Sequence, residues 1–358
     1  MREELFLWAN LDFLTLERIS FLRKHFGNLK NAYQKATEDE LIRLGINPKT
    51  VDTFLCRKEQ FDIDAAYKVF EKLGAKLMFI EDDDYPSLLR EIASPPIFLF
   101  YKGELKKEES CPLAVVGSRL YSAYGKEALG RIIPDLVRKD ITIISGLARG
   151  IDAIAHRECV DQNGRTIGVL GSGIDNVWPN ENRRLAERIL ENDGAIVSEF
   201  PLGTLPFAYN FPRRNRIVSG MSKGVFVIEA RKKSGSLITA QMAIEQNRDV
   251  FALCGNAFAA NSEGVNTLIK KGEAKLVMQA QDIFEEFGID DKVEPRSLIL
   301  SSQEEKKVFD ALSEESMYLD QIIEKIDISA ALVSSTLIML EMKGYVRNLG
   351  MGRWARVV

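Results

Sequence analysis

The sequence predicts an α/β protein whose main domain is a doubly wound, mostly parallel sheet. In the middle of the chain, short β-branched segments alternate with helical patterns, and repeated strand–helix–strand units indicate a parallel sheet with helices packed on it. The two ends of the chain show helical patterns instead. They predict a small helical domain before the sheet and a winged-helix-like domain after it. A length of 358 residues suits two or three domains.

The N-terminal domain is expected over residues 1–75, as a bundle of short helices. Apolar residues recur at helical spacing from Leu16 to Leu29, and Gly27 breaks the first of these helices. Residues 37–40 have the Thr-x-x-Glu pattern of a capping box, which marks the start of another helix. A turn at residues 45–48 precedes a further helix.

The sheet domain is expected over residues 76–287. Its strands are short and almost continuously apolar, as strands buried on both faces should be. Helical patterns such as residues 125–139 and 236–247 lie between them. The predicted strands are residues 113–119, 141–146, 166–171, 195–200, 224–230, 250–255 and 274–278.

The sequence after the last predicted strand is expected to contain a linker and then a third domain. Residues 288–298 are charged and contain a proline, which predicts the linker. Residues 299–358 show three helical patterns followed by an alternating, glycine-containing segment typical of a hairpin. Helix, helix, helix, hairpin is the element order of a winged-helix module.

The overall composition excludes several classes of protein. Hydrophobic residues make up 46% and charged residues 28%, so the chain is neither wholly disordered nor collagen-like nor a disulfide scaffold. The formal net charge of −4 argues against a globally basic nucleic-acid coat, although it leaves room for a local basic groove. No apolar run approaches the roughly 18 residues that a membrane span needs, and the N-terminus lacks the pattern of a signal peptide.

The four cysteines indicate a reducing environment. Cys56, Cys111, Cys159 and Cys254 lie far apart in the sequence, with no CxxC pair. We therefore expect reduced thiols in a cytoplasmic protein and no structural zinc. No cluster of histidine, cysteine and acidic residues has metal-ligand spacing, so no metal is expected.

Three loops at the ends of predicted strands are candidates for anion binding. An open parallel sheet binds its ligand at the carboxyl ends of its strands, where glycine and serine expose backbone N–H groups to a phosphate. The alternative is that these turns need glycine for their geometry alone. Because the loops are neighbours and include arginines, anion binding is favoured. The candidate residues are Gly117, Ser118, Arg119, Gly146, Arg149, Gly171, Ser172 and Gly173.

The segment 205–233 is the most basic part of the chain. It carries seven lysines and arginines against one glutamate, with Phe207, Tyr209 and Phe211 among them. Cations that follow phosphates and rings that stack on bases suit a single nucleic-acid strand, held by a cationic loop that includes Arg213, Arg214 and Arg216. The alternative is a solvated helix face with its rings in the core.

Few residues suggest catalysis. Asp152, His156 and Ser145 contain the residue types of a hydrolase triad, but their spacing does not show that they converge, and an Asp152–His156 pair that fixes the loop is favoured. Glu199 and Glu229 could be acid–base groups or could bond the arginines of the basic segment. The sequence lacks the complete G-x-G-x-x-G fingerprint and the P-loop motif, so neither a dinucleotide cofactor nor an ATPase is expected. No cofactor and no enzymatic activity are predicted.

Six ordered motifs resemble the DNA-processing protein A family (DprA, also called Smf). They lie at 116–119 (VGSR), 145–152 (SGLARGID, with His156), 171–175 (GSGID), 198–206 (SEFPLGTLP), 211–222 (FPRRNRIVSGMS) and 234–252. Residues 84–103 resemble the segment that precedes the Rossmann-like core of this family. The N-terminal region is similar to a SAM-like or helix-hairpin-helix domain, and the C-terminal region to the winged helix that many members carry.

The resemblance implies a cytoplasmic, dimeric protein without catalytic activity that binds single-stranded DNA. It would protect incoming strands and load RecA recombinase on them during natural transformation, the DNA uptake of competent cells. The family's strand-binding pocket maps here to Gly117, Ser118, Arg119, Gly146 through Arg149, Arg165, Phe211, Arg214, Asn215, Arg216 and Lys223.

Two other classes of function stay open. One is a nucleotide-binding hydrolase on a Rossmann-like fold, although residues 234–241 lack the acidic residue of the motif that such enzymes carry. The other is a protein adaptor, against which the basic segment argues because interface cores are poor in charge. The tail from Arg296 onward carries eight basic and nine acidic residues, so it is expected to contact a protein or to bind DNA weakly.

Overall fold

The computed structural model describes residues 3–11, 13–290, 300, 302–312, 316–343, 345–350 and 352–356. The chain divides into two compact units, Met1–Ile289 and Asp290–Val358, and each is described by itself. From residue 291 onward, the predicted linker lies outside the described residues. The boundary expected at residue 75 falls inside the first unit and stays a prediction.

The first unit alternates strands and helices after six N-terminal helices. Its helices are α1 (Glu3–Leu11), α2 (Leu16–Phe26), α3 (Leu29–Lys35), α4 (Glu38–Arg43), α5 (Pro48–Gln60), α6 (Ile63–Lys72), α7 (Ser87–Arg90), α8 (Ala123–Arg138), α9 (Ile151–Asp161), η1 (Asn180–Asn182), α10 (Arg183–Glu191), α11 (Asn210–Gly220), α12 (Gly235–Glu245), α13 (Glu263–Lys270) and α14 (Gln281–Phe287). Its strands are β1 (Lys76–Phe79), β2 (Phe98–Gly103), β3 (Leu113–Val116), β4 (Ile143–Ser145), β5 (Thr166–Val169), β6 (Ala195–Ser198), β7 (Gly224–Val227), β8 (Asp249–Leu253) and β9 (Lys275–Val277).

These strands form one sheet in the order β1-β2-β6-β5-β4-β3-β7-β8-β9. The seven strands from β6 to β9 in this order are parallel, and they are the seven that the sequence predicts. Strands β1 and β2, which the sequence analysis does not identify, extend the β6 edge in antiparallel pairing. The predicted doubly wound, mostly parallel sheet is confirmed.

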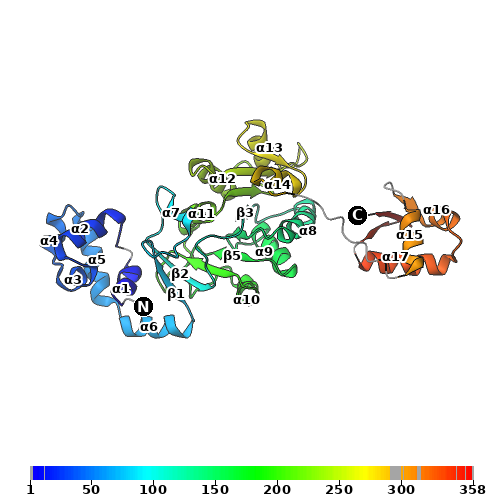
Figure 1. Ribbon diagram of the computed structural model, residues 1–358. Coiled ribbons are helices and arrows are strands. Elements are labelled where there is room, and N and C mark those ends of the chain that lie inside the picture. Colours follow the sequence, from blue (N-terminus) through cyan, green and yellow to red (C-terminus); the bar gives the residue numbers. More distant parts are fainter. Residues whose placement is uncertain are drawn as a thin grey trace. The chain divides into compact units, whose positions relative to one another are not determined.

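The strand order reverses between β3 and β7, which are neighbours in the sheet although their sequence positions are far apart. Successive strands run from β3 to β6 on one side of this point and from β7 to β9 on the other (Figure 1). Loops leaving the carboxyl ends of β3 and β7 therefore diverge and open a crevice, where doubly wound sheets bind ligands.

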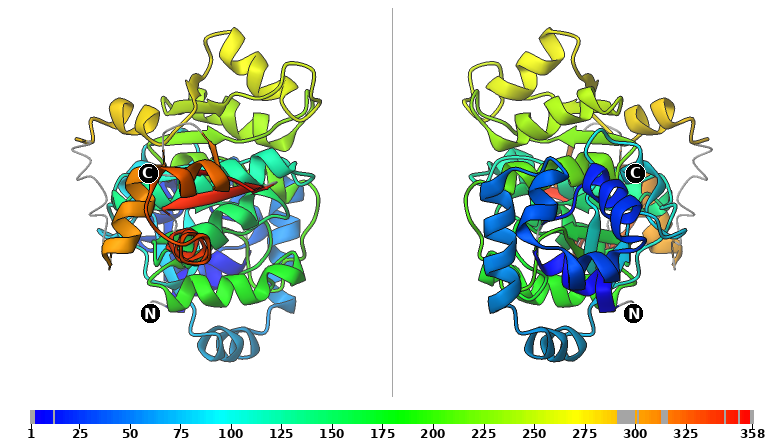
Figure 2. Two further views of the ribbon diagram at one scale, coloured as in Figure 1. Left: turned by 90° about the vertical axis from the view of Figure 1, so that its right-hand side faces the viewer. Right: turned by 90° about the vertical axis from the view of Figure 1, so that its left-hand side faces the viewer.

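Two of the N-terminal helices have an end where the sequence predicts one. Thr37 and Glu40 form the expected capping box at α4, and Gly27 ends α2 with a positive φ of 79°, which glycine adopts without strain. The helices pack at the β1–β2 end of the sheet (Figures 1 and 2). The Phe70 ring lies 6.3 Å from that of Phe100 on β2, and Arg23 pairs with Glu81 at 2.7 Å. One hydrophobic core thus spans the helices and this end of the sheet.

The second unit is a winged-helix domain, as predicted. Helices α15 (Gln303–Ala311), α16 (Leu319–Lys325) and α17 (Ala330–Met342) accompany strands β10 (Met317–Tyr318), β11 (Val346–Gly350) and β12 (Arg353–Arg356). The strands pair in the order β10-β12-β11, and the β11–β12 hairpin is the predicted one. Phe309, Leu337 and Trp354 contribute to its own hydrophobic core.

Other expectations concern covalent and membrane features. All four cysteines are unpaired. Among the described residues, no cluster of three or more histidine, cysteine or acidic side chains is placed to hold a metal ion. No helix in the same residues is both long and apolar enough to cross a bilayer.

Candidate functional site

A cavity of about 570 Å³ opens at the carboxyl ends of β3 and β7, where the strand order reverses. We call it the switch-point pocket. Four loops supply its walls: those that follow β3, β4, β6 and β7. The loops after β3 and β4 contribute residues 117–120 and residues 146, 148 and 152. The loops after β6 and β7, with the helices that follow them, contribute residues 206, 208, 211, 212, 214 and 215 and residues 231 and 233–236.

The pocket is organised by the buried guanidinium of Arg214. This side chain comes from α11, and its Nη1 donates hydrogen bonds to the carbonyl oxygens of Gly146 and Val169. It thereby joins α11 to the ends of β4 and β5. Burial lowers the pKa of Arg214 to about 10, an effect that the carboxylate of Asp152 opposes. The guanidinium therefore stays charged at neutral pH.

Asp152 is the buried acidic counterpart of Arg214. Its Oδ2 accepts a hydrogen bond of 3.1 Å from the Gly146 N–H, so Gly146 is held by Asp152 on one side and Arg214 on the other. Burial raises the pKa of Asp152, whereas the charge of Arg214 and this hydrogen bond lower it. Asp152 and Arg214 both bond the backbone of Gly146, and together they fix the loop after β4.

The glycines of the site make room for protein groups. A Cβ on Gly146 would overlap the guanidinium of Arg214, and one on Gly117 would stand 2.8 Å from Ile151. A Cβ on Gly171 would stand 2.9 Å from the Phe211 ring. The sequence analysis expects these positions to admit phosphate, but at all three the space is already filled by side chains of the protein.

Three cations face the switch-point pocket without a carboxylate partner among the described residues: Arg119, Arg231 and Lys233. Arg119 is exposed and its guanidinium carbon lies 5.5 Å from the Phe211 ring centre. The N-terminus of α12 also borders the pocket at Ser234 to Ser236, and the dipole of this helix favours an anion there. Apart from the paired Arg214–Asp152 couple, the lining is positive.

Aromatic rings lie beside these cations. Phe211 is half-buried between Arg119 and Arg214, with its edge against Gly171. In the preceding loop, the rings of Phe207 and Tyr209 stack with centres 5.5 Å apart, and Tyr209 is 71% exposed. Pro206 and Ala208 of this loop line the pocket. Phe211 in the lining and the exposed rings of the adjoining loop can stack on a planar ligand.

Three arginines of the basic segment, Arg213, Arg214 and Arg216, lie on helix α11 and not in the cationic loop that the sequence predicts. Pro212 lies in the first turn of α11, where its missing N–H costs no helical bond. Phe211, Arg214 and Asn215 face the switch-point pocket. Arg213 and Arg216 lie on the other face, where both pair with the buried Glu199. Helical geometry thus divides the basic cluster between two sites.

Other predicted residues lie outside the pocket lining. Arg149 is close to it but pairs with Glu181 at 2.9 Å. Gly171, Ser172 and Gly173 lie behind Phe211 and the loop after β6, and the Ser172 hydroxyl donates to the Asn176 carbonyl.

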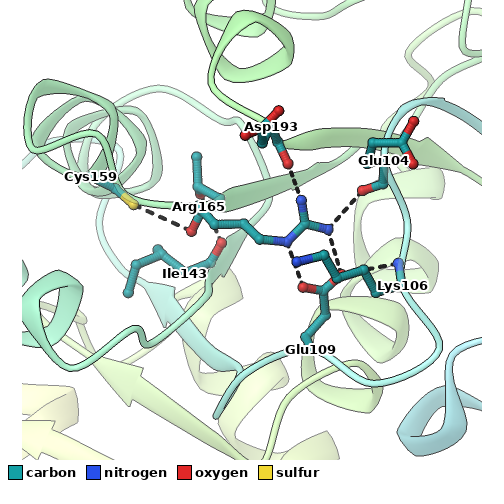
Figure 3. Close-up of polar contacts among 8 residues, drawn as sticks. Glu104, Lys106, Glu109, Ile143, Cys159, Arg165 and Asp193 are labelled. Atoms are coloured by element: carbon teal, nitrogen blue, oxygen red, sulfur yellow. Dashed lines mark hydrogen bonds and ion pairs between the residues drawn. The ribbon is translucent and has the colours of Figure 1, made fainter.

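Arg165 and Lys223 lie at the amino ends of the strands, opposite the pocket. Arg165 directly precedes β5, and Lys223 directly precedes β7. Arg165 is half-buried in a network with Glu109 and with the carbonyls of Glu104 and Asp193 (Figure 3). Its Nε lies 2.6 Å from Glu109 Oε2. This arrangement clamps three loops together and leaves the guanidinium little capacity for a ligand.

The residues that could suggest catalysis form hydrogen bonds within the protein. The Ser145 hydroxyl donates to the Val115 carbonyl at 2.6 Å, and His156 Nδ1 lies 2.7 Å from the Thr166 hydroxyl. The expected Asp152–His156 pair is therefore wrong, since Asp152 bonds Gly146 instead. Glu229 accepts hydrogen bonds from the backbone and hydroxyl of Ser122, at the start of α8.

The sequence analysis leaves the loop after β7 out of its predicted site. Arg231, Lys233 and Ser234 to Ser236 line the pocket, and the same rule that selects the loops after the first three strands would have found them. Arg231 and Lys233 contribute to the charge of the predicted basic segment. Their position directly after a strand, which would have placed them in the pocket, is not used in that prediction.

Fold and site together define a Rossmann-like protein with a cationic, ring-bordered pocket at its strand-order reversal. The chain belongs to the DNA recombination-mediator protein A family, whose model matches residues 76–288. A model for the DprA winged helix domain matches residues 292–350.

Related proteins cover most of the chain. Protein Smf of Synechocystis is 34% identical over 95% of this chain and 94% of its own length, and Protein Smf of Escherichia coli is 45% identical over 70% and 67%. The solved structure of DNA processing protein A from Streptococcus pneumoniae matches with a TM-score of 0.66 and 36% identity, over 80% of this chain and 98% of that one. The Helicobacter pylori protein, described for its unique mode of binding single-stranded DNA, matches with a TM-score of 0.54 and 25% identity, over 60% and 95%.

The buried His156 predicts loss of stability in mild acid. Burial, with the charge of Arg214 adding to it, lowers the pKa of His156 to about 3, so the folded protein holds a neutral imidazole. Since the unfolded chain takes up this proton near pH 6.5, stability falls as the pH drops from about 6.5 toward 3, by roughly 1 kcal/mol per pH unit. Urea unfolding from pH 7 to 5 should show a smaller pH dependence in His156→Gln than in the wild type. Equal dependence would contradict the account.

Gly146→Ala predicts a loss of stability of about 1–3 kcal/mol, because the new methyl group would overlap the guanidinium of Arg214, which is fixed by two carbonyls. Gly235→Ala is the matched control, since a Cβ there has nothing within 4 Å. Thermal unfolding of both variants checks this. Equal midpoints would show that Arg214 can move aside without cost.

Proposed function

We propose that this protein binds single-stranded DNA in the switch-point pocket. The observation that carries the proposal is one concave site lined by Phe211 and by cations without a carboxylate partner among the described residues (Arg119, Arg231, Lys233), with the stacked rings of Phe207 and Tyr209 in the adjoining loop. Cations bind the phosphates of a strand, and rings stack on its bases. Family membership and the single-stranded DNA binding of the Helicobacter pylori protein support the same function.

The geometry favours a single strand over a duplex. In a duplex the bases are stacked on each other, so the rings at the pocket rim would find no free base face, whereas a single strand can turn its bases toward them. Phosphate contacts and ring stacking do not distinguish one base from another. We therefore expect little sequence preference.

The nucleotide-hydrolase alternative lacks a reactive group in the pocket. Ser234 caps α12 by accepting from the Ser236 N–H, and residues 234–241 contain no acid. Asp152 is the acidic residue of the lining, and it is committed to Gly146 and Arg214. These contacts support a binding protein without catalytic activity.

In the cell, the bound strand would be protected from nucleases and loaded with RecA in the cytoplasm during natural transformation. Family membership supports this role, together with assembly as a homodimer. Sedimentation equilibrium tests the dimer, and a single species at the mass of one chain would contradict it. RecA filament assembly on strands covered by single-strand binding protein tests the loading.

The winged-helix domain is proposed to contact a protein or to bind DNA only weakly. In DNA-reading modules of this kind, a helix enters the major groove with basic and polar side chains. The third helix, α17, has no lysine or arginine and exposes Leu332, Ile338 and Met339. Such a surface cannot neutralise phosphates.

Arg119→Ala should weaken binding of a labelled oligothymidine about tenfold and reduce the slope of log affinity against log salt by about 0.7, the value of one lost phosphate contact. Fluorescence anisotropy at several salt concentrations measures both. Arg149→Ala is the control, because Arg149 is paired with Glu181 and lies outside the pocket lining. Equal effects of the two substitutions would refute the assignment of the pocket.

Deletion of residues 296–358 should leave affinity for a single strand within about twofold of the full chain, because α17 offers no cation. The same anisotropy assay checks this. A collapse of affinity in a truncated protein that is still folded by circular dichroism would place the DNA-binding surface on the winged helix.

A further inference from the structure

A second cavity lies beside the switch-point pocket, past the carboxyl ends of β7 and β8. It measures about 660 Å³, and its walls include Tyr124, Glu229, Arg231, Asn256 and Asn261. We call it the outer pocket. Apart from Arg231, which belongs to the basic segment, none of its residues is among those that the sequence or the family resemblance assigns to DNA binding.

The two cavities share a wall. Arg231 lines both, and its Nε donates to Asn261 Oδ1 at 3.0 Å. Asn261 in turn donates to the carbonyl of Leu120 at 2.8 Å, and Leu120 lines the switch-point pocket. A chain that leaves the first cavity over Arg231 therefore enters the second.

Tyr124 lines the outer pocket, and Phe258 lies in the loop that supplies its walls at Asn256 and Ala259. Phe258 is 98% exposed, and Tyr124 is 47% exposed with its hydroxyl fixed on the Cys254 carbonyl at 2.6 Å. The loop that carries Phe258 is ordered by its own bonds, since the Phe258 N–H donates to Asn256 Oδ1 at 2.9 Å and the Ala259 N–H to the Asn256 carbonyl at 3.1 Å. A large apolar ring held in water by a structured loop indicates a contact surface.

The charges of the outer pocket suit bases better than phosphates. Arg231 is the cation of its lining, whereas the switch-point pocket has Arg119, Arg231 and Lys233. The buried Glu229 carboxylate at its base accepts from Ser122 and repels phosphate. A strand whose phosphates stay on Arg231 would turn its bases toward Tyr124 and Phe258.

We propose that the outer pocket is a second base-binding subsite, which takes the same DNA strand as it leaves the switch-point pocket over Arg231. This inference rests on the proposed function. It assigns Phe258 as the stacking platform, Tyr124 as its neighbour and Arg231 as the phosphate contact between the two cavities.

The test is affinity as a function of strand length, by anisotropy. A strand of about 4 nucleotides fills the switch-point pocket alone, whereas one of about 15 also reaches the outer pocket. Phe258→Ala should weaken binding of the long strand at least about fivefold, the lower value of one lost base–ring stack, and leave the short strand unchanged. Phe258→Trp should restore the long-strand affinity. Phe21→Ala removes a ring of α2 that is 49% exposed, and it should change neither.

A second readout uses 2-aminopurine placed near one end of the long strand. Its fluorescence should be quenched on the wild-type protein at one of the two ends and recover in Phe258→Ala. If the long strand binds no better than the short one, or if Phe258→Ala weakens neither or both equally, the outer pocket is not a separate subsite. If neither strand binds the wild type, the proposed function itself fails.

Discussion

The site depends on one buried interaction, the contact of the Arg214 guanidinium with the carbonyls of Gly146 and Val169. It holds α11, the helix that follows β6, against the carboxyl ends of β4 and β5. The charge of Asp152 opposes the effect of burial on the pKa of Arg214, and its carboxylate holds the Gly146 N–H of the loop after β4. A cation this deeply buried makes few ligand contacts itself. Its role is to position the walls of the pocket, and this explains why the chain tolerates the cost of burying it.

Arginines that pair with a carboxylate have a structural role, whereas those without such a partner can bind a ligand. Arg149, Arg165, Arg213 and Arg216 each face a carboxylate, so a phosphate would have to displace a formed ion pair. Arg119 and its neighbours in the switch-point pocket have no such competitor among the described residues. The positive potential is therefore concentrated where the rings are, although the chain as a whole carries a net charge of −4. A local field of this kind can attract a polyanion without a basic protein surface.

The fold could be predicted from the sequence because parallel strands buried on both faces leave short, continuous apolar runs. Strands β1 and β2 are not predicted, because they pair antiparallel, β1 with β2 and β2 with β6, outside the strand–helix–strand units on which the prediction rests. The positions of Arg165 and Lys223 follow from their place before a strand. The division of Arg213 and Arg216 from Arg214 follows from helical spacing, but only the packed structure shows which face meets the pocket. Glu199, their partner, is brought to them by the tertiary fold.

The most direct test of strand binding in the switch-point pocket is ultraviolet cross-linking of an oligothymidine to the full chain, with the attached peptides identified by mass spectrometry. The account predicts cross-links in residues 117–120 and 206–215, which comprise the loop of Arg119, the loop of Phe207 and Tyr209, and the first turns of α11 with Phe211. Cross-links confined to the winged-helix domain or to the N-terminal helices would contradict it.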